Sequence, residues 1–416
     1  MNGKLFSARK FLSQCAVVGV LAFVIGANVA HADWPSYRGP LGNGASTEKN
    51  WNAQFPADGP KVLWRADFGT GISAVTISGG RAYSMGNVDG ADVIYCLDAS
   101  TGREQWRHKF PLKLDDNMFE GGPRSTPTVD GDRVYTVSHE GDLWCLNATT
   151  GKPIWYHHYQ KDFNGRRPSW GYAGSPLVTG KMVVCDVGAE NGSTVALDKE
   201  TGATIWKAGA DKAGYASPVE ATVDGKSVIV VLKADSLVGC DVKDGHELWR
   251  GKWKTDYDVN AATPLVVSNN RILVSSGYNA GCILYEITGS EAKELWRNKN
   301  LRAHINSPVA LQGFVYGIDG NANGGELVCL DLANGQRKWQ DKSVKGGSLI
   351  SANGKLIILT EKGELITGDA SPEGFHPISR AQIFDKRCWV QPTLASGKLY
   401  VKDNFGEARC LSLGAN

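Results

Sequence analysis

The fold is decided by a stretch that reads CLDASTGREQW, from Cys96 to Trp106. It joins a short apolar strand to a second strand through a tight turn. Asp98 can accept hydrogen bonds from backbone N–H groups two residues further on, and Gly102 can adopt a positive φ. Trp106 then lies on the second strand, with an indole N–H that needs a partner when the ring is buried. The stretch therefore predicts a β-hairpin that carries a large buried ring.

The same hairpin recurs along the chain, and its last residue is usually a tryptophan. These motif tryptophans, together with one that lacks a first strand, are Trp64, Trp106, Trp155, Trp206, Trp249, Trp296 and Trp339. From the second one onward they are 49, 51, 43, 47 and 43 residues apart. A period in the forties with several short strands per repeat is typical of the blades of a β-propeller. We expect these rings to pack between neighbouring blades.

Two incomplete repeats complete the count. The repeat at residues 365–370 is followed by no tryptophan, and the chain ends at residues 410–412 before a second hairpin strand. Residues 61–66 have the pattern of that missing strand. We therefore predict that the terminal strands pair and close the ring without a free edge. The result is an all-β fold, an eight-bladed β-propeller of four-stranded antiparallel blades.

The repeat Ala/Cys-Leu-Asp-x-x-Thr-Gly-x-x-x-Trp, with Ser-Pro or Thr-Pro opening the next unit, resembles the pyrroloquinoline-quinone (PQQ) repeat. The resemblance covers about residues 61–414. This propeller family includes the quinoprotein dehydrogenases and BamB, the non-catalytic lipoprotein of the outer-membrane assembly machinery. The resemblance therefore implies the fold, but its branches imply different functions, because one fold hosts unrelated activities.

Residues 1–32 are predicted to be a cleavable signal peptide. A basic start precedes an apolar run and a small-residue cleavage site that ends at Ala32. An uncleaved membrane anchor is the alternative, although the apolar run is short for a membrane span. No lipidation site is expected, because the only cysteine in this segment, Cys15, precedes the apolar run. We predict export to the periplasm or cell envelope.

The remainder divides into an arm and one repeat domain. Residues 33–60 lack periodicity and predict an N-terminal extended arm that lies on the propeller through Trp34 and Tyr37. A partner-binding tail is the alternative for this segment. Residues 61–416 form the PQQ-like propeller.

The charge of the chain excludes several classes of partner. The sequence has 45 Lys and Arg against 43 Asp and Glu, a formal net charge of +2. Loss of the signal peptide removes three basic residues and leaves a net charge of −1. A nearly neutral chain with interspersed charges has no electrostatic footprint for nucleic acid or for an anionic membrane. We expect a monomer that does not bind nucleic acid and that is not stably inserted in a membrane once the signal is removed.

Eight cysteines follow the signal: Cys96, Cys145, Cys185, Cys240, Cys282, Cys329, Cys388 and Cys410. Five of them occupy the same repeat position in different blades. A disulfide needs Cα atoms within about 7 Å, whereas packed sheets lie about 10 Å apart, so we expect small buried thiols instead. The sequence has no Cys-x-x-Cys pair and no histidine spacing typical of metal ligands, so we predict no metal site.

The loops that lead into the innermost strands should gather on one face around the axis, here called the mouth. Their charged and aromatic side chains suit a ligand or a peptide from a partner. The candidate residues are Asp116, Glu120, Arg124, Arg167, Trp170, Tyr172, Tyr215, Asp258, Asn260, His304, Asn306, Trp389 and Gln391. The alternative for each is an ordinary solvated loop position.

Quinoproteins imply PQQ held between a tryptophan and a disulfide of adjacent cysteines, with calcium and a catalytic aspartate. Here no two cysteines are adjacent, and only Trp170 and Trp389 are candidates for stacking. No acidic residue matches a catalytic motif. We therefore predict a binding or scaffold module for an envelope protein or polysaccharide, with no cofactor and no catalytic residue. A PQQ- and calcium-dependent oxidoreductase for alcohols or sugars and a carbohydrate-binding propeller are the alternatives.

Overall fold

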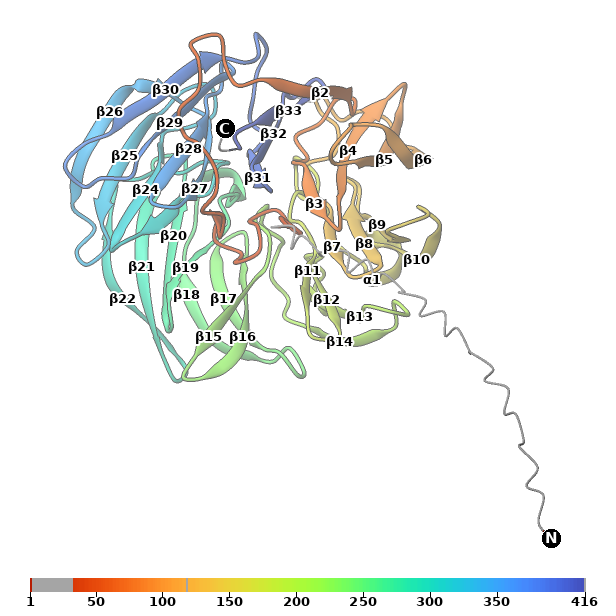
Figure 1. Ribbon diagram of the computed structural model, residues 1–416. Coiled ribbons are helices and arrows are strands. Elements are labelled where there is room, and N and C mark those ends of the chain that lie inside the picture. The colour runs from red at the N-terminus through yellow and green to blue at the C-terminus, as the bar shows by residue number, and fades with distance from the viewer. Residues whose placement is uncertain (2–32, 117–118, 415–416) are drawn as a thin grey trace. The chain divides into compact units, whose positions relative to one another are not determined.

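The computed structural model describes residue 1, residues 33–116 and residues 119–414. In this part of the chain, eight sheets surround a common centre, seven of four strands and one of five (Figure 1). The predicted eight-bladed propeller is thereby confirmed. The predicted signal peptide lies outside the described residues, apart from Met1. The described chain contains no helix that is both long and apolar enough to cross a membrane.

The blades follow one another along the chain, and each begins with its innermost strand. The first four consist of β3 (Thr76–Ser78), β4 (Arg81–Val88), β5 (Ala91–Asp98) and β6 (Glu104–Pro111); β7 (Thr128–Asp130), β8 (Arg133–Val137), β9 (Asp142–Asn147) and β10 (Pro153–His158); β11 (Leu177–Thr179), β12 (Met182–Asp186), β13 (Thr194–Asp198) and β14 (Thr204–Ala208); and β15 (Val219–Val223), β16 (Lys226–Leu232), β17 (Ser236–Asp241) and β18 (Glu247–Lys252). The next three consist of β19 (Leu265–Ser268), β20 (Arg271–Ser276), β21 (Gly281–Thr288) and β22 (Glu291–Asn298); β23 (Val309–Leu311), β24 (Phe314–Asp319), β25 (Glu326–Asp331) and β26 (Arg337–Lys345); and β27 (Ser348–Ala352), β28 (Lys355–Leu359), β29 (Glu364–Asp369) and β30 (His376–Gln382). One short helix, α1 (Tyr159–Phe163), follows β10, and a 3₁₀ turn, η1 (Asp256–Asp258), follows β18.

The eighth blade joins the two ends of the propeller. It contains β31 (Thr393–Ala395), β32 (Lys398–Lys402) and β33 (Glu407–Ser412), and its outermost strand is β2 (Val62–Asp67). β2 pairs antiparallel with β33 and places Trp64 opposite Cys410. The predicted closure is confirmed, since the outer edge of β33 is covered by a strand from the other end of the chain.

The seventh blade differs from the predicted four-stranded pattern. A two-residue strand from the arm, β1 (Ala45–Ser46), pairs in parallel with β27 and makes this sheet five-stranded. Figure 1 shows the arm, in red and orange, running from the centre of the ring past β27 to β2. The arm therefore covers an inner sheet edge.

The turn of the repeat forms as its residues predict. Asp98 Oδ1 accepts backbone hydrogen bonds from Ser100 at 3.0 Å and Thr101 at 2.9 Å. The carbonyl of Asp98 accepts from the N–H of Gly102, which has a φ of 73°. Hydrogen bonds from both hydroxyls to the same carboxylate hold its pKa at about 2. The carboxylate thus fixes the turn from within.

The motif tryptophans connect each blade to the next. Six of the seven donate their indole N–H to a carbonyl of the following blade, at 2.8–3.1 Å. The pairs are Trp64 with Ala99, Trp106 with Ala148, Trp155 with Lys199, Trp206 with Val242, Trp296 with Leu332, and Trp339 with Ser371. The rings of most of them also lie against the turn glycine of that blade. The predicted packing role is confirmed for these six.

Trp249 is the exception, and the next repeat explains it. The fifth blade has Thr288-Gly289, but Gly289 follows Glu286 by three residues instead of four, and the space beside Gly289 is open. Trp249 instead lies over Gly239 of its own blade, where a Cβ atom would be 2.1 Å from the ring. Its indole nitrogen is buried without a hydrogen-bond partner. The contact between blades therefore needs both a tryptophan in one blade and a turn of matching length in the next.

Two glycines with positive φ allow two effects of an alanine substitution to be measured separately. One effect is the strain of the backbone, and the other is the clash with a motif tryptophan. Gly151 (φ 68°) lies against Trp106, and an added Cβ would be 2.5 Å from the ring. Gly131 (φ 57°) has open space in the same direction. We expect Gly131→Ala to lower the free energy of unfolding by about 1 kcal/mol and Gly151→Ala by about 3 kcal/mol, since overpacking adds to the backbone cost. Urea unfolding measures both, and equal losses would contradict the contact between Trp106 and Gly151.

Candidate functional site

A series of hydrogen bonds between blades surrounds much of the central channel. Each uses the serine or threonine that precedes the proline at the entry to an innermost strand. Its hydroxyl oxygen accepts from a backbone N–H of the preceding blade, at 2.8–3.4 Å. The pairs, donor first, are Ala74 with Thr126, Thr126 with Ser175, Ser175 with Ser217, Ser217 with Thr263, and Thr263 with Ser307. These bonds hold the inner ends of the blades together and bring the mouth loops into one place.

The arm enters the channel from blades one and two. Trp34 is buried and exchanges two backbone hydrogen bonds with Ile77 of β3, at 2.8 and 2.9 Å. The carbonyl of Pro35 accepts from the N–H of Val129 in β7 at 2.8 Å. The arm therefore begins as an additional strand segment along two innermost strands.

Arg38 fastens the arm to the far side of the channel. Its buried guanidinium donates to the carbonyls of Ser307 and Pro308, at 3.4 and 2.6 Å, and to Gln391 Oε1 at 2.6 Å. Burial lowers the pKa of Arg38 to about 10. Because blades one, two, six and eight are all engaged, the arm crosses the channel. The sequence analysis did not single out Arg38.

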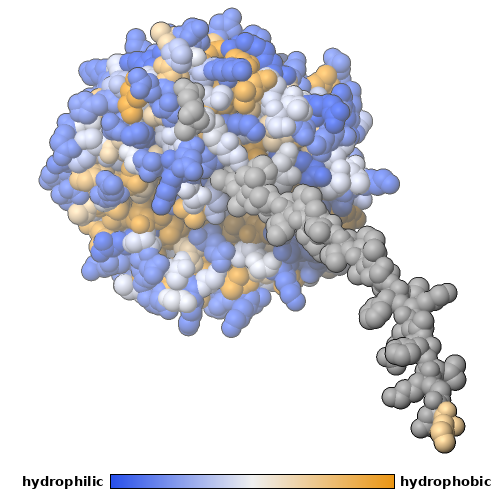
Figure 2. Space-filling model, viewed as in Figure 1, coloured by the Kyte–Doolittle hydropathy of each residue, from blue (hydrophilic) through white to orange (hydrophobic). Residues whose placement is uncertain are grey.

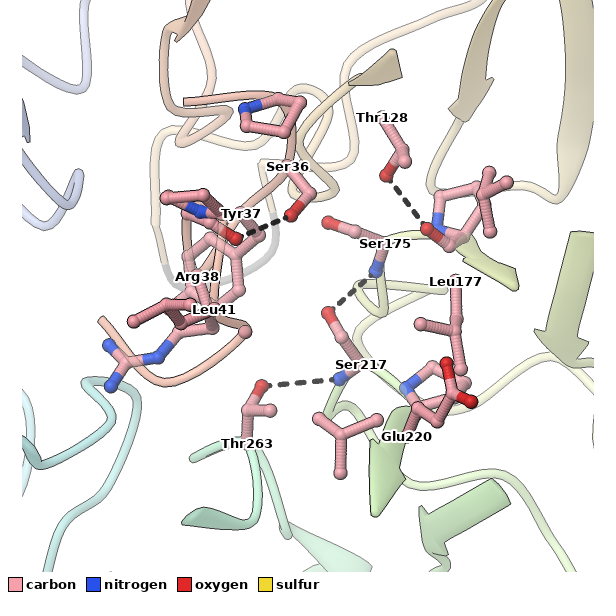
Figure 3. Close-up of a pocket in the computed structure, with 18 of the residues that line it drawn as sticks. Ser36, Tyr37, Arg38, Leu41, Thr128, Ser175, Leu177, Ser217, Glu220 and Thr263 are labelled. Carbon is pink, nitrogen blue, oxygen red and sulfur yellow. Dashed lines mark hydrogen bonds between the residues drawn. The ribbon is translucent and has the colours of Figure 1, made fainter. Parts of the chain in front are cut away.

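Two cavities lie along this channel and adjoin at Tyr37, Ser175, Ser217 and Thr263, which line both. The first, of about 490 Å³, lies between arm residues 35–42 and the innermost strands of blades two to five, and is called the arm cavity. Figure 3 shows its wall, where the hydroxyl of Ser217 accepts from the Ser175 N–H and Thr263 accepts from Ser217. Figure 2 shows that hydrophilic residues cover most of the face in view, with smaller apolar patches between them.

The second, called the mouth cavity, has a volume of about 180 Å³. Seven of the thirteen predicted site residues line it: Glu120, Arg124, Trp170, Tyr215, His304, Trp389 and Gln391. The sequence analysis missed Phe119 and Tyr278, and it treated Tyr37 only as an arm contact. Tyr278 belongs to the loop between β20 and β21, a class of loop that was not counted as part of the mouth. The hydroxyls that precede the prolines were visible as Ser-Pro and Thr-Pro but were read only as strand starts.

Three of the predicted residues are built into the scaffold instead. Tyr172 is buried edge-on against Tyr159, and its O–H donates to a carbonyl at 3.2 Å. Asn260 is fully buried and donates to the carbonyls of Lys233 and Ala234, both at 2.9 Å. Asn306 donates to a carbonyl of the seventh blade. Each of the three side chains satisfies backbone carbonyls rather than facing the mouth cavity.

The other three lie on the rim. Asp116 is exposed. Asp258 lies 3.6 Å from the ammonium group of Lys212. Arg167 pairs with Asp115 and, at 2.6 Å, with Glu140. The structure therefore separates the thirteen candidates into a lined cavity, a scaffold set and a charged rim.

The acidic groups beside the mouth cavity are engaged by neighbours. Glu120 accepts from Arg387 at 2.9 Å and from the amide of Asn404 at 3.3 Å. Glu361 accepts the indole N–H of Trp389. The guanidinium of Arg387 also lies over the Trp389 ring, 4.9 Å from its centroid, in cation–π geometry. Glu120 is therefore paired with a cation, whereas Glu361 is held by a neutral donor.

One cluster has ligand types suited to a metal. Ligand atoms of Asp115, His139 and Glu140 all lie within 4.8 Å of one another. However, the Arg167 guanidinium bridges both carboxylates and lowers the pKa of Asp115 against the effect of burial. Burial, together with the guanidiniums of Arg124 and Arg167, lowers the pKa of His139 to about 4. A metal ion here would compete with a cation that the chain already supplies, so the cluster is an ion-pair network.

The chain is similar to known propeller proteins in both sequence and structure. A family model described as outer membrane protein assembly factor BamB matches residues 53–118 and 90–341. No curated protein sequence matches the chain. Among solved structures, BamB from Moraxella catarrhalis is similar with a TM-score of 0.61 and 15% identity over 85% of this chain and 99% of that one.

Two dehydrogenases are similar in the same way. A quinohemoprotein alcohol dehydrogenase from Comamonas testosteroni has a TM-score of 0.71 and 14% identity over 92% of this chain and 81% of that one. A europium-containing methanol dehydrogenase has a TM-score of 0.67 and 11% identity over 90% of both chains. At these identities the likeness to solved structures shows the fold alone.

The arm attachment predicts a large cost for one arginine. Arg38→Met leaves the carbonyls of Ser307 and Pro308 and the side chain of Gln391 without their buried donor. We expect the free energy of unfolding to fall by about 3–5 kcal/mol, because three buried acceptors lose their donor at about 1–3 kcal/mol for each unsatisfied group. Arg65→Met, which removes an exposed pair with Glu407, should cost less than about 1 kcal/mol. Urea unfolding compares the two, and a similar small loss for both would show that Arg38 does not hold the arm.

Proposed function

Because the chain belongs to the family described as outer membrane protein assembly factor BamB, we propose that it is a non-catalytic binding module that holds a partner at its mouth. The partner in this proposal is a protein or polymer of the cell envelope. The observation that supports this proposal is the different composition of the rim and of the cavity at the mouth. Several charged groups of the rim pair with one another, as Arg387 does with Glu120, while aromatic rings line the cavity. Such a surface can bind without offering a poised acid or base.

The aromatic walls support binding through contact area. Trp170 is partly exposed, and its ring centroid lies 6.2 Å from that of Tyr215. Across the cavity, Tyr278 meets His304 edge-on at 4.9 Å and Tyr257 at 5.4 Å. Aromatic side chains supply large contact area and are enriched at binding hot spots.

In this proposal the site takes neither PQQ nor calcium. One face of Trp389 is covered by Arg387, and Phe119 meets it edge-on at 4.7 Å, so it is not a free stacking platform. Calcium takes six to eight oxygen ligands, but Glu120, a carboxylate that lines the mouth cavity, is paired with Arg387. The eight described cysteines are each buried and free, and burial raises the pKa of their thiols, that of Cys96 to about 12. None of them is placed to form an adjacent-cysteine disulfide.

The proposal extends to location and assembly. Family membership and the predicted signal peptide both favour export to the periplasm or envelope. The nearly balanced charge provides no attraction to an anionic membrane surface, so in this proposal a monomer meets its partner through the mouth. A polysaccharide partner is the second candidate, since aromatic walls also suit sugar rings.

A capture experiment tests the partner-binding proposal. Tagged mature protein is incubated with envelope extract, and bound material is analysed by mass spectrometry and by sugar analysis. We expect Trp170→Ala with Tyr278→Ala to lose the bound partner at least tenfold. The matched control, Ile205→Ala with Leu295→Ala, removes exposed apolar side chains from outer strands and should keep it. Equal retention by both variants would contradict a mouth site.

A second measurement separates binding from quinoprotein chemistry. The mature protein is mixed with PQQ and calcium, and calorimetry is combined with dye-linked oxidation of alcohols and aldoses. We expect binding no tighter than the micromolar range and no turnover above a protein-free control. Sub-micromolar binding with substrate-dependent dye reduction would reject the proposal in favour of an oxidoreductase.

A further inference from the structure

We infer that the mouth cavity is an anion site in which the guanidinium of Arg124 is the counter-ion for the carboxylate of a ligand with a small apolar or aromatic body. This inference rests on the proposed function and adds the chemistry of the bound group. It comes from the hydrogen-bonding state of the residues that line the cavity.

Arg124 differs from the other arginines at the mouth. Arg387 pairs with a carboxylate at 2.9 Å, Arg167 with two, and Arg166 donates to two carbonyls and a glutamate. Arg302 is paired with Asp319 at 2.7 Å. Within the described chain, Arg124 has no carboxylate within 4 Å.

The polar contacts of Arg124 are correspondingly few. Its Nη2 donates to the carbonyl of Asp115 at a long 3.4 Å, and its Nη1 is buried without a partner. Burial lowers the pKa of Arg124, but a guanidinium remains charged at neutral pH. Asp115 and Asp92 act on it only from beyond ion-pair distance. Arg124 is only partly buried, and a partly buried cation without a counter-ion is still costly, so a bound carboxylate at its cavity-facing side would offset that cost.

The rest of the lining is rich in donors. Ser175, Ser217 and Thr263 use their oxygens to accept backbone N–H groups, which leaves each O–H hydrogen available to a ligand. His304 Nδ1 accepts from the N–H of Ala322 at 3.0 Å, so the neutral ring carries its hydrogen on Nε2. Burial lowers the pKa of His304 to about 4, which keeps it in this form.

Acceptors are fewer than donors in the same lining. The carboxylate of Glu120 already receives Arg387 and Asn404, and Gln391 Oε1 receives Arg38. One unpaired cation and several neutral donors favour a ligand with one negative charge and hydrogen-bond acceptors. A carboxylate has both, and its two oxygens match the geometry of a guanidinium.

The size and walls of the cavity define the body of the ligand. A volume of about 180 Å³ is below the roughly 300–1,000 Å³ of sites for drug-sized molecules. Phe119, Trp170, Tyr215 and Trp389 supply aromatic walls, and Tyr37 adjoins the arm cavity. The cavity therefore suits one ring or a short apolar chain next to the carboxylate. Two sources have this chemistry: a free aromatic acid and the C-terminal residue of a polypeptide.

Calorimetry tests the assignment with two matched pairs of probes. The first pair is phenylacetate and phenylacetamide. The second is acetyl-Gly-Gly-Phe with a free C-terminal carboxylate and the same peptide with a C-terminal amide. We expect the acids to bind at least tenfold more tightly than their amides, because only the acids provide a charge for Arg124. Binding of the free acid alone identifies a small-molecule source, and binding of the peptide alone identifies a chain terminus.

Variants then connect the binding to one side chain. Arg124→Gln should weaken acid binding at least tenfold, whereas Arg166→Gln, which removes a paired arginine of the same mouth, should leave it unchanged. Thermal melting provides a second readout. Arg124→Gln should melt no lower than the unsubstituted protein, and phenylacetate should raise the melting temperature only when Arg124 is present. If the glutamine variant proves unstable, Arg124→Lys keeps the charge without the planar pair of donors and should bind the acids more weakly.

The outcomes that overturn the anion site differ from those that overturn the binding module. Equal affinity for acids and amides, or acid binding unchanged in Arg124→Gln, rejects the anion site. If that occurs while envelope capture still depends on Trp170, the mouth remains a partner site with another chemistry. Loss of both results rejects the proposed function as well.

Discussion

The indole of Trp106 lies against Gly151 and donates to the carbonyl of Ala148, and repeated copies of this contact hold the blades at their outer side. The eight blades are separate sheets, so no continuous strand ladder connects one with the next. The inner side is held by a different contact, in which a backbone N–H donates to the hydroxyl before the next proline. Two attachments at opposite ends of a blade fix its spacing and tilt. The mouth loops begin at the inner attachment, and their side chains therefore meet at fixed distances.

The arm crosses the central channel, and its residues 35–42 line the arm cavity. Tyr37 lies where the mouth cavity and the arm cavity adjoin, so a residue of the arm forms part of the wall of both. Arg38 carries the arm across by donating to carbonyls of one blade and to Gln391 of another. Gln391 in turn donates to the carbonyl of Tyr37 at 2.6 Å. A residue of the mouth and a residue of the arm thus position each other, which couples the depth of the mouth cavity to the attachment of the arm.

The fold could be predicted from the sequence because its signals are local and repeated. The Asp98 turn, the glycine with positive φ and the tryptophan lie within eleven residues, and five well-formed copies fix the period. Ring closure was also predictable, since Trp64 lacked a first strand. Trp249 shows the limit of this reasoning: its own repeat is intact, but the turn of the following repeat is one residue shorter and leaves the space beside Gly289 open. Packing between repeats needs the sequence of both partners.

The site was less predictable because loop side chains follow no period. Blade order correctly located the loops that enter the innermost strands, which is why Trp170 and His304 were found. It could not show that Tyr172 and Asn260, on the same loops, turn inward to satisfy backbone carbonyls. Nor could it show which of several arginines would lack a partner, since ion pairs join loops from different blades.

That last distinction connects stability with function at the mouth. Arg387 and Arg167 stabilise the loops through ion pairs with carboxylates of neighbouring loops, and these carboxylates compensate their charges. Arg124 contributes no such pair, and only one long hydrogen bond to the Asp115 carbonyl offsets the cost of its partial burial. Proteins tend to carry such local conflicts where function needs them. A ligand anion would relieve the conflict, and the gain in free energy would appear as affinity. Because Glu120 and Asp115 are paired with Arg387 and Arg167, these two acids repel a negative group less than free carboxylates would.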